Sequence, residues 1–100
     1  MKMYILIRDD LPKNKQAVQG GHALAQFALD WPESFNKWNN HTIVYMKVGY
    51  DELRDLEFSL VEDYGLACSE FYEPDLGDQL TALAVLNSNE SDCFGKFRLL

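Results

Sequence analysis

The chain has 100 residues, 47% of them hydrophobic and thirteen aromatic, so it is long enough for one packed domain and too short for two. Its net charge is −7, divided as +2 on residues 1–50 and −9 on residues 51–100, which excludes strong nonspecific binding of nucleic acid. No segment has the pattern of a signal peptide or the length of a membrane span, so we expect a cytoplasmic protein without membrane contact. Cys68 and Cys93 match no metal-ligand spacing and are expected to be free, buried thiols.

The predicted elements begin with a strand and a long helix. Met3–Ile7 is a continuous apolar run, which is typical of a buried strand. A helix is predicted from Asn14, as its N-cap, to about Asp30, because Pro32 disfavours helical geometry in the residue before it. The next predicted elements are a short helix at Glu33–Trp38, a strand at Thr42–Val48, a helix at Glu52–Tyr64 capped by Asp51, and strands at Ala67–Tyr72 and Leu80–Leu86.

This order of elements, with strands that are apolar on both sides, predicts an α/β fold. We expect a single three-layer α/β/α domain over residues 1–100, with a four-stranded mixed sheet. The last two strands should be antiparallel because the segment between them is too short for a helical crossover. Asn87–Asp92 is expected to be a polar loop, and the pattern of Cys93–Leu100 does not decide its secondary structure.

The long helix has two stripes of different chemistry. The apolar stripe, expected to face the sheet, contains Val18, Gly21, Leu24, Ala25, Ala28 and Leu29. The polar stripe contains Lys15, Gln19, His22 and Gln26, where a surface helix usually carries Glu and Lys. Gly20 and Gly21 each cost about 1 kcal/mol of helix propensity relative to Ala, which indicates close packing or a ligand. Packing alone, against a sheet, is an alternative that requires no ligand.

The same region carries a motif that extends along the chain. It reads Arg8-x-Asp10-Leu11, then Lys15-x-Ala17-x-Gln19-x-x-His22-Ala23, and weaker matches continue to about Val85 at Trp38, Lys47-Val48, Asp51-Glu52-Leu53, Gly65-Leu66 and Thr81-Ala82-Leu83-Ala84. These residues resemble the archaeal/eukaryotic-type, or second-class, peptidyl-tRNA hydrolases. Two segments differ from that family. The loop before the helix is only Pro12-Lys13-Asn14, and Glu73–Gln79 stands where the family has Asp-Ala-Gly-Arg-Thr-Gln.

The resemblance implies a hydrolase that cleaves the ester between peptide and tRNA with an activated water and without a cofactor. The candidate catalytic residues are Lys15, His22, Asp75 and Thr81. The candidate substrate-binding residues are Arg8, Lys13, Gln19 and Gln79. An imidazole can exchange a proton near neutral pH, a lysine can stabilise an oxyanion, and a carboxylate can orient water. No metal-ligand set is visible in the sequence, so no metal is expected.

Other interpretations remain open for the same residues. His22 can be a helix histidine bonded to a carbonyl, Lys15 a solvated lysine, Asp75 a turn aspartate after Pro74, and Thr81 an ordinary strand threonine. The function can be that of a catalytically inactive binding domain, because the family's loop Arg and Thr are absent, or that of a hydrolase for a smaller ester or amide. Whether the protein hydrolyses peptidyl-tRNA or only binds it, this binding should be weak and salt-dependent. The small domain is also expected to form a homodimer.

Overall fold

The structure, a computed structural model, describes residues 1–88, 94 and 97–100. Its elements are β1 (Lys2–Arg8), α1 (Lys13–Asp30), α2 (Pro32–Trp38), β2 (Thr42–Val48), α3 (Tyr50–Glu62), β3 (Cys68–Glu73), the 3₁₀ turn η1 (Pro74–Leu76), β4 (Gln79–Asn87) and β5 (Arg98–Leu99). The strands form one sheet in the order β3-β4-β1-β2-β5. β1 and β2 are parallel, and the other neighbours are antiparallel.

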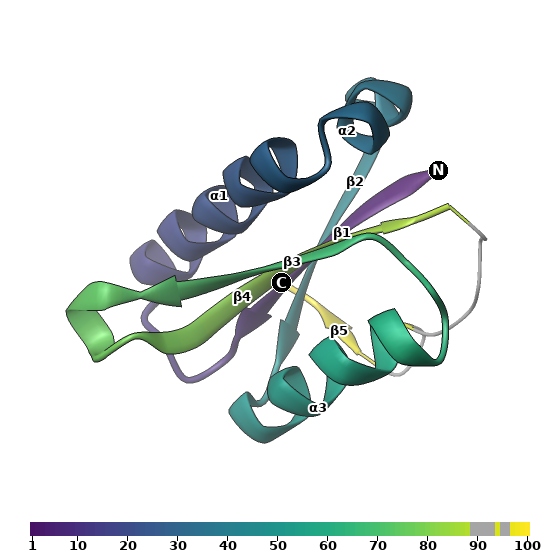
Figure 1. The fold of residues 1–100 in the computed structure, drawn as a ribbon. Coiled ribbons are helices and arrows are strands. Elements are labelled where there is room, and N and C mark those ends of the chain that lie inside the picture. Colours follow the sequence, from purple (N-terminus) through teal and green to yellow (C-terminus); the bar gives the residue numbers. More distant parts are fainter. Residues whose placement is uncertain (89–93, 95–96) are drawn as a thin grey trace.

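Helices cover both faces of this sheet, with α1 and α2 on one side and α3 on the other (Figure 1). The predicted α/β class, the three layers and the mixed sheet are therefore confirmed, as is the antiparallel pairing of β3 with β4. The sheet differs from the prediction in having a fifth strand, β5, which pairs with β2. Periodicity could not identify β5 because it has only two residues.

Each face of the sheet has its own apolar core. The core under α1 and α2 includes Met3, Ile5, Ile7, Ala23, Phe27 and Trp38. The core under α3 includes Leu6, Val48, Leu53, Leu60, Leu83 and Val85. Successive residues of a strand point to opposite faces, so a strand covered on both sides must be apolar at nearly every position. This geometry explains the continuous apolar runs of β1 and β4.

The face of α1 that packs on the sheet is not the predicted apolar stripe. Its buried residues are Gln16, Gln19, Gly20, Ala23 and Phe27. Val18 is 51% exposed and Leu29 is 77% exposed, and Ala25 is exposed as well. The prediction was wrong because it placed polar residues on the outside, whereas the buried amide of Gln16 is satisfied by donating to the Leu11 carbonyl at 2.8 Å.

Gly20 accounts for the orientation of α1. A Cβ atom at this position would lie 2.9 Å from Ile7 Cδ1 and 3.1 Å from Tyr45 Cε1, so only glycine lets the helix lie this close to the sheet. The neighbouring Gly21 has open space where its side chain would be. Packing therefore explains the first glycine of the pair and leaves the second unexplained.

The helix starts also differ from the predicted ones. α1 begins at Lys13, directly after Pro12, so Asn14 is not its N-cap. α3 begins at Tyr50, and Asp51 lies in its first turn, where a carboxylate favours the positive end of the helix dipole. Most of the predicted loop at Asn87–Asp92 lies outside the described residues, as does Cys93, whereas Cys68 is a free, buried thiol as predicted.

Candidate active site

A β-bulge in β4 places a polar group under α1. The register between β3 and β4 shifts next to Phe71, which leaves Thr81 as an extra residue between Leu80 and Ala82. Leu80 belongs to the core under α3, and Ala82 belongs to the core under α1. Thr81 also lies on the α1 side, where its hydroxyl donates to the Oε1 atom of Gln19 at 2.5 Å. The bulge thus directs a fully buried hydroxyl towards the helix.

Gln19 connects this buried hydroxyl to a carboxylate at the surface. Its Nε2 atom donates to the Oε2 atom of Glu73, the last residue of β3, at 2.7 Å. The other oxygen of Glu73 accepts the backbone N–H of Asp75 at 3.2 Å. Because Gln19 is 4% exposed and bonded at both ends of its amide, it holds the Glu73 carboxylate in one position.

A pocket of about 370 Å³ lies between α1 and η1, beside this carboxylate. It is lined by Leu11, Pro12, Lys15, Val18, Gln19, His22, Glu73, Asp75 and Leu76. The polar stripe of α1 therefore supplies an ammonium, an amide and an imidazole, and the β3–β4 connection supplies two carboxylates. Val18 and Leu76 add apolar surface, and this mixture is typical of a small-molecule site.

The charges in the pocket act on Glu73. The hydrogen bond from Gln19, followed by that from the Asp75 amide, lowers the pKa of Glu73, and the charges of His22 and Lys15 act in the same direction. Glu73 is therefore an anion at neutral pH. A carboxylate with a lowered pKa is a weak base, so this arrangement suits it to orienting a cation or an imidazole.

The imidazole of His22 is held by stacking. Its ring lies on the ring of Phe71, with centroids 4.5 Å apart and planes 9° apart. The residue is exposed, so the free side of the ring can reach solvent or a ligand. Phe71 also belongs to the edge of the core under α1, and this contact fixes the ring plane to the sheet.

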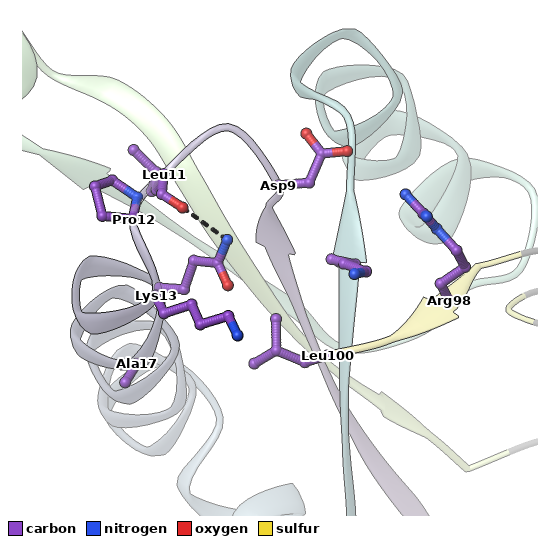
Figure 2. Close-up of a pocket in the computed structure, with 9 residues that line it drawn as sticks. Asp9, Leu11, Pro12, Lys13, Ala17, Arg98 and Leu100 are labelled. Atoms are coloured by element: carbon purple, nitrogen blue, oxygen red, sulfur yellow. Dashed lines mark hydrogen bonds between the residues drawn. The ribbon is translucent and has the colours of Figure 1, made fainter.

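Of the eight site residues predicted from the sequence, four line this pocket together: Lys15, Gln19, His22 and Asp75. Thr81 is fully buried behind Gln19 and does not line the pocket. Lys13 lines a neighbouring pocket, shown in Figure 2, which shares Pro12 with this one.

The two remaining candidates, Arg8 and Gln79, contact each other. The Nη1 atom of Arg8 donates to Gln79 Oε1 at 2.8 Å and to the Leu80 carbonyl at 3.3 Å. Its Nε and Nη2 atoms bind both oxygens of Asp10, and its guanidinium lies 4.2 Å from the ring centroid of Tyr50. The side chain of Arg8 is thus occupied within the protein, where it joins the end of β1 to the start of β4. Neither Arg8 nor Gln79 lines the two pockets described above.

Glu73 lines the pocket but was not among the site residues predicted from the sequence. Its position before Pro74-Asp75 has the appearance of an ordinary turn, and its pairing with Gln19 spans 54 residues. No periodicity relates two segments so far apart. The available signal was the amide of Gln19 on a helix stripe, since a buried amide needs a polar partner.

A scan against protein-family models finds no matching family, and a search of curated proteins finds no match. Within residues 1–88, 94 and 97–100, no three His, Cys, Asp or Glu side chains are grouped so that they can hold a metal ion. Among the helices of that same part of the chain, none has the length and apolar character needed to cross a membrane.

Proposed function

We propose that this pocket hydrolyses the ester that joins a peptide to tRNA. The observation that carries the proposal is the meeting of Lys15, His22, Glu73 and Asp75 in one pocket. Ester hydrolysis requires a base for water, a positive group for the oxyanion and a means of positioning both. The resemblance of the Lys15–His22 segment to the second-class peptidyl-tRNA hydrolases supports the choice of substrate.

In the proposed reaction, His22 accepts a proton from the attacking water. The resulting hydroxide adds to the carbonyl carbon, and the ammonium of Lys15 stabilises the oxyanion. When the tetrahedral intermediate collapses, the ribose 3′ oxygen leaves and receives the proton from the imidazolium. Glu73 stabilises the charged imidazole, and Asp75 orients the water. Gln19 and Thr81 are positioning residues, since they act through the carboxylate of Glu73.

The test is release of tRNA from an N-acetylaminoacyl-tRNA by the purified protein. His22→Ala should reduce turnover by about 10²-fold or more, the usual contribution of a general base. Lys15→Ala should reduce it by a similar factor, because it removes an oxyanion contact. Gln26→Ala is the matched control: Gln26 is on the same stripe of α1, bonds to Asp30 and lies outside the pocket. Equal turnover in the His22→Ala and wild-type proteins would contradict the proposal.

Two other functions have support in the loop and the pocket. The segment Glu73–Gln79 lacks the family's Arg and Thr and carries the acidic Glu73, Asp75 and Asp78, which favours a binding domain without activity. Binding of the tRNA without turnover, unchanged in His22→Ala, would support this function. The volume of about 370 Å³ is also suitable for a small ester or amide. Turnover of N-acetylaminoacyl methyl esters, with none of the tRNA substrate, would indicate such a hydrolase.

We also propose that the protein is a cytoplasmic homodimer. Phe58 is 69% exposed and Val61 is 48% exposed, and the two lie three residues apart on α3. Large apolar side chains on one helix face are typical of a contact surface. Light scattering at micromolar concentration should give twice 11.5 kDa, and the monomer mass alone would refute the dimer.

A further inference from the structure

A second pocket, of about 750 Å³, adjoins the candidate active site. The two pockets have two lining residues in common, Leu11 and Pro12. The second pocket is built from the start of α1, the end of β2 and the strand β5, and Leu100 lies between Lys13 and Arg98 in Figure 2. Its lining combines apolar residues with charged ones.

Three cations line this pocket, Lys13, Lys47 and Arg98, against one carboxylate, Asp9. The protein carries a net charge of −7 and has nine Lys and Arg residues in all, so this local positive charge runs against the overall charge. None of the three cations forms an ion pair with another described residue. In Figure 2 the carboxylate of Asp9 is turned away from Lys13 and Leu100. Within the described part of the chain, no carboxylate therefore pairs with these three cations.

The sheet register adds a second observation. Lys47 of β2 and Arg98 of β5 are directly opposite each other in an antiparallel pair. Side chains opposite each other share a face, and like charges in that arrangement destabilise the pairing. An anion bound between them removes this repulsion and forms hydrogen bonds with both. The pair of Lys47 and Arg98 therefore destabilises the strand pairing by itself but favours the binding of an anion.

We propose that this pocket binds the phosphate group of a phosphorylated ligand. The guanidinium of Arg98 suits the bidentate recognition of a phosphate, and Lys13 and Lys47 supply point charges. The volume of about 750 Å³ is larger than one phosphate requires, so the remainder of the ligand lies on the apolar surface of Leu11, Ala17 and Leu100. A ribonucleotide has this composition, as a free nucleotide or as a unit of an RNA chain. The proposal does not depend on hydrolysis in the adjoining pocket.

The test is binding of two probes, a single-stranded RNA tetranucleotide and ATP, measured by calorimetry at low salt with the full chain. Lys47→Gln and Arg98→Gln should each weaken binding by about tenfold or more, as expected for one charged hydrogen bond. Lys37→Gln is the matched control, because Lys37 is an exposed lysine near the end of α2 and lines neither pocket. Each of the two pocket substitutions should also lower the salt slope of RNA binding by about 1.

The two probes separate the sources of the phosphate. Tighter binding of the tetranucleotide indicates an RNA chain, and equal or tighter binding of ATP indicates a free nucleotide. The thermal midpoint of the unliganded Lys47→Gln protein should equal or exceed that of the wild type, because the substitution removes the repulsion from Arg98. Absence of binding by both probes at millimolar concentration, or an equal loss in Lys37→Gln, would overturn the proposal.

Discussion

The adjacent glycines of α1 allow packing and helix propensity to be measured separately in one helix. Gly21→Ala adds a methyl group into open space and should stabilise the protein by about 1 kcal/mol, the propensity difference between Gly and Ala. Gly20→Ala gains the same propensity but brings the new Cβ atom to 2.9 Å from Ile7 Cδ1, which is fully buried. Carbon atoms prefer about 3.5–4.0 Å, so either the isoleucine or the helix must move by about 0.6 Å or more.

Overpacking of this kind costs about 1–3 kcal/mol, so Gly20→Ala should be less stable than Gly21→Ala by that amount. The assay is urea unfolding followed by circular dichroism, with thermal melting as a second measurement. For a domain of this size, a difference of 1 kcal/mol corresponds to about 4–8 °C in the thermal midpoint. Equal stability of the two variants would refute the account of why α1 lies so close to the sheet. Displacement of the helix by Gly20→Ala should also reduce the proposed activity, because it moves Gln19 away from Glu73.

Three further expectations concern single side chains. Arg8 lowers the pKa of Asp10 below its ordinary value of 3.8, so the pair stabilises the protein above about pH 4, and this contribution is lost as the pH falls through the lowered native value. Acid unfolding of Asp10→Asn should therefore show a weaker pH dependence than that of the wild type. Identical unfolding curves would exclude this contribution. Thr81→Val leaves the buried oxygen of Gln19 without its donor and should cost about 1–3 kcal/mol in urea unfolding, whereas wild-type stability would show that the bulge hydroxyl is dispensable. Burial raises the pKa of the Cys68 thiol to about 12, so this thiol should not react rapidly at pH 8. The native wild-type and Cys68→Ser proteins should therefore show equal rapid labelling by a thiol reagent. One extra reactive thiol in the wild type would contradict the burial of Cys68.

Local pattern was sufficient to predict the class of the fold and the positions of most elements. The strand predicted at Thr42–Val48 has those bounds in the structure, because β-branched and aromatic residues are concentrated there. The long helix α1 was expected to end near Asp30 and does so, because Pro32 restricts the backbone of the residue before it. The spacing of Lys15, Gln19 and His22 was also enough to place them on one stripe, since 3.6 residues per turn is a local property.

The tertiary structure decided which side of α1 is buried and what meets its polar stripe. A buried glutamine contradicts the simple rule of polar residues outside, and it is stable here because Thr81 and Glu73 satisfy both ends of the Gln19 amide. Those partners are 62 and 54 residues away, and one of them reaches the helix through a bulge that hydrophobic periodicity does not encode. The second pocket depends likewise on β5, whose two residues bring Arg98 beside Lys47. Sequence pattern predicts elements because their hydrogen bonds are local, whereas the sites arise from long-range pairs that only the packed chain brings together.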